Sequence, residues 1–123
     1  MSLLVSIVSK DTNVNIEKIE KEIYNSHNEL FGFESWRKEV WGNEIMESIG
    51  CNLLYSLSQK DVYVYDSDIQ ILKHELYKVI EQIETVSKVT RVNKEAIEFR
   101  VRNALEMVRV AEKHSDNVGI VIG

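Results

Sequence analysis

The second half of the chain contains two neighbouring segments in which apolar residues recur every three or four positions. The first segment runs from Ile69 to Val86 and the second from Ile97 to Ala111. Because an α-helix completes a turn in about 3.6 residues, this spacing puts each apolar set on one side of a helix. The polar stretch between them, Ser87 to Asn93, is typical of a short connection between helices. The pattern therefore predicts two long helices that form an antiparallel hairpin.

Short apolar runs predict strands at both ends of the chain and in its middle. Leu3 to Val8 and Val118 to Ile122 are rich in β-branched residues, which predicts strands buried on both faces. We expect these two strands to pair near the centre of a sheet. Leu53 to Leu57 and Val62 to Tyr65 are predicted to form a hairpin closed by the polar link from Ser58 to Asp61.

Two shorter helices are predicted between the first strand and the middle of the chain. The first has isoleucines at helical spacing from Ile16 to Ile23 after Asn13 or Asn15, either of which suits the N-cap position, and it is expected to end near residues 26–28. The second begins after Asn43 and ends at Gly50, a residue type that commonly ends helices. Strands and helices thus follow one another without a regular repeat, which is typical of α+β proteins. We expect residues 1–123 to form one small, helix-rich α+β domain with the helical hairpin packed on a short sheet.

Composition is that of a soluble globular protein. Hydrophobic residues make up 44% of the chain and charged residues 28%, which is ordinary for this class. No apolar run approaches the ~20 residues that span a bilayer, so we expect no membrane partner. Cys51 is the only cysteine, which favours a reducing compartment. No basic segment or cleavage site marks a signal peptide, and we therefore expect a cytoplasmic protein.

The net charge of −5 is unevenly distributed. Residues 1–87 hold 8 Lys and Arg against 15 Asp and Glu, whereas residues 88–123 hold 7 against 5. An acidic body disfavours nucleic acid and anionic membranes as partners, because phosphate contacts need clustered positive charge. The same charge suits a basic protein partner, or serves only to keep the protein soluble.

Arg100 and Asn103 interrupt the apolar side of the second long helix. That side spans an arc of roughly 240°, which predicts a helix covered on two sides. A guanidinium inside such an arc must be paired or must reach the edge of the buried region. We expect Arg100 to meet a carboxylate from residues 1–87 or at least two backbone carbonyls. The alternative is a ligand contact in a cleft between this helix and the sheet.

Aromatic residues provide a second candidate surface. Trp36 and Trp41 lie in an aromatic-rich segment, which either covers one edge of the core or stays partly exposed. In the exposed case, Tyr63 and Tyr65 of the predicted hairpin extend the patch. Trp, Tyr and Arg are the residue types enriched at protein interfaces.

Catalytic, metal-binding and cofactor-binding motifs are not found. The helix around His74 lacks the second histidine of the zinc-protease pattern. His27 and Glu29 are a weak metal pair because no further ligand follows at a recognisable spacing. Glycine-rich phosphate loops and the Gly-x-Ser-x-Gly motif are absent. We therefore predict no catalytic residue, no metal site and no cofactor, and Cys51 is expected to be a buried, unreactive thiol.

These observations favour a non-enzymatic protein that binds another protein. A concrete version is an inhibitor or immunity-type protein whose acidic surface covers a basic toxin, an analogy of size and charge alone. The alternative is a small-molecule-binding protein or small enzyme with a cleft near Arg100, Asn103 and Tyr63 or Tyr65. The position of the largest pocket separates these two hypotheses.

A homodimer is a third hypothesis. Phe99, Met107 and Val110 widen the apolar side of the second long helix. If the chain's own strands leave these residues uncovered, a second subunit is expected to cover them, because large exposed apolar patches are rare.

Overall fold

In the computed structural model, which describes all residues from 1 to 123, four strands form one antiparallel sheet. The strands are β1 (Ser2–Ser9), β2 (Leu30–Phe33), β3 (Val62–Val64) and β4 (Val118–Ile122). Their spatial order is β2-β1-β4-β3. The first and last strands are therefore the central pair, as the sequence predicts, and their register runs from Val5 opposite Ile122 to Ser9 opposite Val118.

Only one face of the sheet is covered. Leu3, Val5 and Ile7 of β1 point into the core, whereas the residues that alternate with them are partly exposed. The prediction that β1 is buried on both faces is wrong, because α-helices cover one face of the sheet and leave the other open. Tyr63 of β3 lies on the open face and is 58% exposed.

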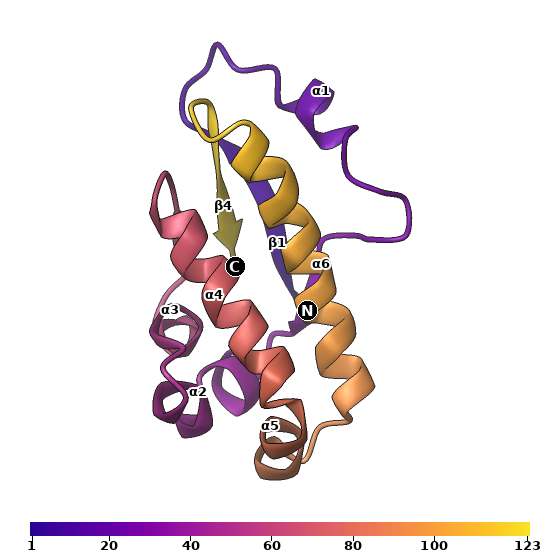
Figure 1. Cartoon of the computed structure of the whole chain (residues 1–123), viewed down its shortest axis with the longest axis vertical. Helices are drawn as coiled ribbons and strands as arrows, with labels where there is room; N and C mark the ends of the chain where they lie inside the picture. Colours follow the sequence, from indigo (N-terminus) through magenta and orange to yellow (C-terminus); the bar gives the residue numbers. More distant parts are fainter.

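The helical layer consists mainly of α4 (Asp68–Glu81), α5 (Ile83–Thr90) and α6 (Lys94–Lys113). Figure 1 shows α4 and α6 in front of β1 and β4. α6 begins at Asn93, whose side chain accepts hydrogen bonds from the amides of Glu95 and Ala96. No helix combines the length and the apolar character needed to cross a membrane.

The structure does not confirm a simple two-helix hairpin. The first predicted helix is interrupted at Gln82 (φ −105°, ψ 20°), so that three helices stand where two are predicted. α5 ends at Arg91 in the left-handed conformation. Leu76 of α4 and Val101 of α6 are nevertheless both fully buried, as expected for residues packed between neighbouring helices.

The middle of the chain is helical where one strand is predicted. A π-helical turn, η1 (Arg37–Trp41), is followed by α2 (Glu44–Ser48), α3 (Asn52–Tyr55) and the 3-10 turn η2 (Ser56–Ser58). The predicted strand Leu53–Leu57, and with it the hairpin, is wrong. The buried carboxylate of Glu75 accepts from the amides of Leu53 and Leu54, which satisfies the first donors of α3. The Asn43 cap is confirmed, since its side chain accepts from the Ile45 amide.

The N-terminal helix is shorter than predicted. α1 (Ile16–Glu20) is capped by Asn15 and ends before Ile23. The residues that follow run along one side of α6 (Figure 1) and are held there by polar contacts. This segment leads directly into β2, and α6 therefore helps to place the edge of the sheet.

Candidate protein-binding surface

Four side chains from separate parts of the chain form a continuous cluster, which we call the Arg100 patch: Phe33, Trp36, Phe99 and Arg100. β2 supplies Phe33, the residue before η1 is Trp36, and α6 supplies the other two. The rings of Phe33 and Trp36 meet edge to face with their centroids 6.1 Å apart. The guanidinium carbon of Arg100 lies 5.3 Å from the Trp36 ring centroid and 5.2 Å from that of Phe99. The cation is thus held by aromatic rings.

Arg100 makes few polar contacts. Its Nη1 donates to the Ala96 carbonyl at 3.4 Å, whereas its Nε is buried without a hydrogen-bond partner. It takes part in no ion pair. The expectation of a carboxylate or of two carbonyls is wrong, because cation–π contacts hold the guanidinium in their place. Arg100 is also the only residue with a buried side-chain nitrogen or oxygen that lacks a partner.

The two tryptophans belong to the core. Trp41 is fully buried, stacks on Phe31 with a centroid separation of 4.3 Å, and donates its indole N–H to the Phe31 carbonyl. Trp36 is 5% exposed and packs edge to face on Trp41. The hypothesis that either tryptophan stays partly exposed is therefore wrong, and the alternative that they cover an edge of the core is confirmed.

The exposed aromatic residues of the patch are phenylalanines that the sequence does not connect with Arg100, since Phe99 is expected only as a homodimer contact. Phe33 is 57% exposed and Phe99 40% exposed. The available signals were weak. Phe33 follows Gly32, whose φ of +114° gives β2 an irregular path, and Phe99 lies at the margin of the apolar arc of α6.

Asn103 has a structural role. It is fully buried, and its amide nitrogen donates to the Asn28 side chain at 3.0 Å and to the Leu30 carbonyl at 2.9 Å. Its side-chain oxygen accepts from the Asn28 amide at 3.2 Å. Because the chain's own groups occupy its donors and acceptor, the prediction of Asn103 as a ligand contact is corrected. It fastens the start of β2 to α6.

Tyr63 and Tyr65 do not join the Arg100 patch. Tyr63 lies on β3, and two strands separate β3 from β2 in the sheet. Tyr65 is partly buried against Gly119, where an added Cβ would come within 2.4 Å of the tyrosine ring. The predicted binding residues thus do not converge on one site: Arg100 lies at a surface, Asn103 is buried, and the tyrosines lie at the opposite edge of the sheet.

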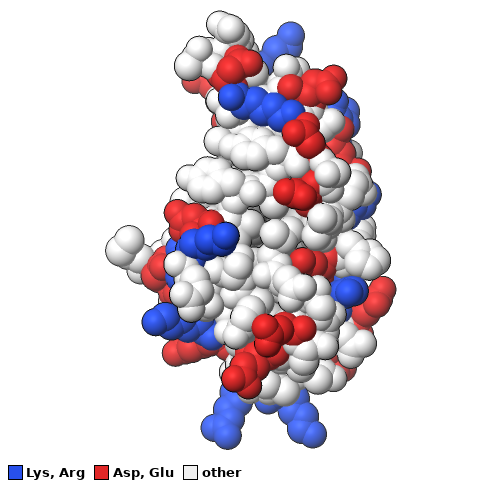
Figure 2. Space-filling view, turned by 90° about the vertical axis from the view of Figure 1, so that its left-hand side faces the viewer, with Lys and Arg blue, Asp and Glu red and all other residues white.

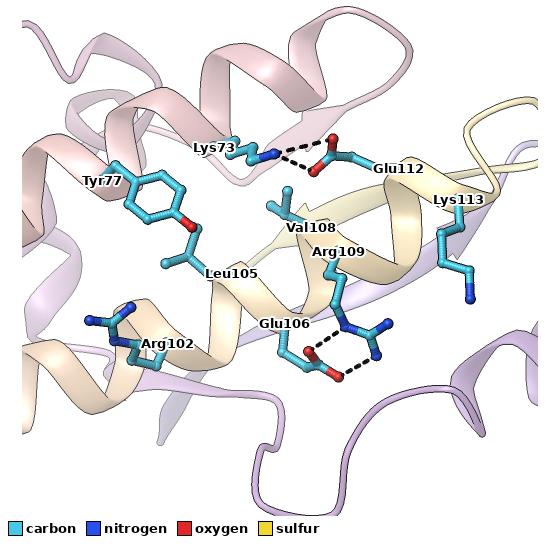
Figure 3. Close-up of a pocket in the computed structure, with 9 residues that line it drawn as sticks. All are labelled: Lys73, Tyr77, Arg102, Leu105, Glu106, Val108, Arg109, Glu112 and Lys113. Atoms are coloured by element: carbon cyan, nitrogen blue, oxygen red, sulfur yellow. Dashed lines mark hydrogen bonds and ion pairs between the residues drawn. The ribbon is translucent and has the colours of Figure 1, made fainter.

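A hollow of about 450 Å³ lies between α4 and α6, away from Arg100. Lys73 and Tyr77 line it from α4, and α6 supplies the remaining side chains (Figure 3). Lys73 Nζ lies 3.1 Å from a Glu112 oxygen. Arg109 forms a second pair with Glu106, and Figure 3 shows each charged side chain of the two pairs turned toward its partner. The Lys73–Glu112 pair connects α4 with α6, whereas the Glu106–Arg109 pair lies within α6.

A second hollow, of about 390 Å³, lies beside α1 and the end of α6. His114, the residue that ends α6, approaches the Glu22 carboxylate to 2.6 Å, and Lys113 reaches the other oxygen at 2.9 Å. The hydrogen bond from Lys113 lowers the pKa of Glu22 most, and the hydrogen bond with His114 lowers it further. No group of three or more His, Cys, Asp and Glu side chains is placed to hold a metal ion.

Glu106 differs from its sequence-based assignment. The helical spacing places it on the solvent face, yet it is only 6% exposed. Its carboxylate accepts from Nε and Nη2 of Arg109 and from the amide of Tyr24, each at 2.8 Å. The Arg109 hydrogen bonds lower the pKa of Glu106. The i,i+4 spacing along α6 predicts pairs of Arg102 with both Glu98 and Glu106. The Glu98 pair is present at 3.7 Å, whereas the Glu106 pair is absent.

Glu75 and Cys51 form a second buried polar group that sequence reasoning missed. Glu75 is 4% exposed, and burial raises the pKa of its carboxyl. Cys51 is buried at the N-cap position of α3, where the preceding Gly50 predicts a helix end, and its Sγ donates to the Glu75 carbonyl at 3.4 Å. The expected unreactive thiol is consistent with burial, which raises the pKa of Cys51 to about 12.

Comparisons with protein-family models, with curated proteins and with solved structures gave no match. Function is therefore inferred from the geometry of this chain.

Proposed function

We propose that the protein is a non-enzymatic binding module that contacts another protein through the Arg100 patch. One observation carries the proposal: a guanidinium held between two aromatic rings, with no anionic partner in the chain. Aromatic residues and Arg are enriched in the cores of protein interfaces, and Trp and Arg are frequent binding hot spots. The exposed rings of Phe33 and Phe99 add the apolar area that such an interface buries.

The placement of the hollows favours a protein partner over a small ligand at Arg100. A cleft with Arg100 in its wall would support a small-molecule site, because ligand pockets enclose most of their ligand. The two largest hollows lie instead between α4 and α6 and beside α1. A surface of exposed rings around a cation is better suited to the broad contact that a protein makes.

The charge of the chain bears on the kind of partner. A net charge of −5 favours a partner of positive net charge, as in a pair formed by an inhibitor or immunity-type protein and a basic toxin. On the side shown in Figure 2, acidic and basic side chains lie interspersed with uncharged ones. The proposed interface therefore combines long-range attraction between net charges with a local contact made by Arg100 and the aromatic rings around it. The same proposal places the protein in the cytoplasm.

A homodimer through the apolar side of α6 has less support. Met107 and Val110 are 3% and 0% exposed within the single chain, so its own elements already cover them. Of the residues proposed for the dimer contact, only Phe99 is exposed enough to meet a second subunit, and it belongs to the Arg100 patch.

Photo-crosslinking in the source cell tests the proposal. A photoreactive phenylalanine analogue replaces Phe99 in one variant and Ile71 of α4 in the control variant; the native side chains are 40% and 49% exposed. We expect the variant at position 99 to yield a discrete adduct with one other protein, and the variant at position 71 to yield none. Equal yields of the same adduct would contradict the proposal, and an adduct with a second copy of the chain would replace it with a homodimer.

A further inference from the structure

The unpaired donors of Arg100 indicate what its partner presents. We propose that the Arg100 patch recognises a carboxylate flanked by an aromatic side chain, both supplied by one surface segment of the partner protein. This inference rests on the proposed function and specifies the chemistry of the same surface.

The Arg100 guanidinium has hydrogen-bond donors that the chain leaves unused. A guanidinium presents N–H donors on Nε, Nη1 and Nη2 and has no acceptor. In this chain only Nη1 has a protein acceptor, the Ala96 carbonyl. Nε is buried without a partner, whereas Nη2 is accessible and also lacks an acceptor. An incoming carboxylate therefore meets free N–H donors on Nη2 and displaces no existing ion pair.

The carboxylates that adjoin the two exposed phenylalanines of the patch in sequence are engaged with other arginines. Glu98 pairs with Arg102 at 3.7 Å, and Glu34 pairs with Arg37 at 2.7 Å. Arg102 and Arg109, the other arginines of α6, each form an ion pair, whereas Arg100 forms none. An anion that pairs with Arg100 is therefore expected from the partner protein.

The guanidinium of Arg100 is already held in place before a partner binds. Trp36 is 5% exposed and is wedged between Phe33 and Trp41, so the ring beneath the guanidinium is fixed by the core. The stacked guanidinium loses little further freedom when an anion binds, which favours affinity. Arg pairs with carboxylates in a planar, often bidentate geometry, which makes it more selective for this group than a lysine.

The exposed rings of the patch favour an aromatic side chain next to the partner's carboxylate. Phe33 and Phe99 expose 57% and 40% of their surface on either side of the Trp36–Arg100 contact. An aromatic residue next to the partner's carboxylate covers one of these rings and excludes water from the ion pair. Exclusion of water strengthens the charge–charge attraction.

Three short peptides test the inference by NMR titration of the ¹⁵N-labelled protein. Acetyl-Phe-Glu-Phe-amide carries a side-chain carboxylate, acetyl-Phe-Gln-Phe-amide is its neutral match, and acetyl-Phe-Gln-Phe with a free C-terminus carries a terminal carboxylate. The signals followed are the Arg100 Nε–H and the Trp36 indole N–H. Arg100→Met is the test variant, and Arg102→Met, which removes an arginine already paired with Glu98, is the matched control.

We expect at least one carboxylate peptide to shift both signals and to bind about tenfold or more tightly than the neutral peptide. In Arg100→Met, the Trp36 signal should no longer distinguish the peptides, whereas in Arg102→Met the preference should persist. Whichever carboxylate peptide binds more tightly identifies the source of the anion.

Three results would overturn the inference: equal binding of the neutral peptide, no shift with any peptide, or tighter binding of inorganic phosphate than of both carboxylate peptides. Each of them is independent of the proposed function. A crosslinked partner at position 99 together with equal binding of the neutral peptide would retain the protein-binding surface and remove only carboxylate recognition.

Discussion

Two arginines of the same helix, Arg109 and Arg100, have opposite surroundings. Near the C-terminal end of α6, Arg109 donates from Nε and Nη2 to Glu106 and from Nη2 to the Glu22 carbonyl, each at 2.8 Å. Its guanidinium also lies 4.3 Å from the Tyr24 ring centroid. In the N-terminal half of α6, Arg100 has rings on its faces and a single carbonyl acceptor.

The difference separates an arginine that serves the fold from one that remains free to serve recognition. Arg109 ties the segment after α1 to α6, and its pairing with Glu106 raises the pKa of the guanidinium and lowers that of the carboxyl. Arg100 ties no segment in this way, although its side chain is held in place. Replacing Arg109 is therefore expected to lower the stability of the fold, whereas replacing Arg100 is expected to remove binding and leave stability nearly unchanged.

The largest stability effect is expected for Arg109→Met. The substitution leaves the nearly buried Glu106 carboxylate with only the Tyr24 amide as donor. Removing one partner of a buried ion pair costs several kcal/mol, but the Arg109 side chain is 36% exposed and the loss is correspondingly smaller. We expect the free energy of unfolding in urea to fall by about 2 kcal/mol. An effect no larger than that of Arg100→Met would remove the distinction between the two arginines.

The pH dependence of stability sharpens the comparison. The pKa of Glu106 is lower in the folded than in the unfolded protein, so its ionised form stabilises the fold above the unfolded value of about 4.3. That contribution is lost as the pH falls through the lower, folded-state pKa. Urea unfolding between neutral pH and about pH 2 should therefore show a smaller acid-side loss in Arg109→Met than in the wild type. An unchanged acid-side loss would contradict the role of this pair.

Glu75 affects the pH dependence of stability in the opposite direction to Glu106. Burial raises its pKa above the unfolded value, so the ionised form is destabilised in the fold. As the pH falls through the raised pKa toward about 4.3, this penalty is relieved. The Arg109→Met comparison isolates Glu106 because Glu75 is present in both proteins.

Arg100→Met should alter stability by less than about 1 kcal/mol, the worth of a cation–π contact at a partly exposed site. The methionine keeps an apolar contact with Trp36 and removes the buried, unpartnered Nε. Binding through the patch should nevertheless be lost. A urea melt showing destabilisation as large as that of Arg109→Met would indicate that Arg100 is structural.

The smallest effect is expected for Arg102→Ala. Its pair with Glu98 spans 3.7 Å, and both side chains are 47% exposed. Exposed pairs of this kind contribute about 0.5 kcal/mol or less. The unfolding midpoint in urea should remain close to that of the wild type, and a large shift would indicate a contact that the structure does not contain.

The sequence predicts the parts of the fold that depend on local pattern. The central pairing of β1 with β4 and the long helix α6 follow from apolar runs and helical spacing. The Leu53–Leu57 segment is mispredicted because its helical turn depends on Glu75, which lies more than one element away and offers no local signal. Periodicity also places Glu106 on a solvent face that the segment after α1 covers in the folded chain.

The candidate site could be predicted only in part for the same reason. Helical phase identifies Arg100 as a cation within an apolar arc, but it does not show whether a carboxylate or an aromatic ring meets it. Trp36 and Phe33 arrive from β2 and the residues after it, where Gly32 at φ +114° changes the path of the chain. Helical phase alone fits Asn103 to a ligand contact as well as to a structural role. The fold decides between them, because Asn28 and Leu30 accept hydrogen bonds from its side-chain amide.

The most direct test of the central claim is the yield of the crosslinked adduct from position 99 when Arg100 is replaced. We expect Arg100→Met to abolish the adduct with the partner protein while the variant remains folded, and Arg102→Met to retain it. Retention of the adduct in Arg100→Met at the wild-type yield would show that Arg100 is not the recognition residue of this surface.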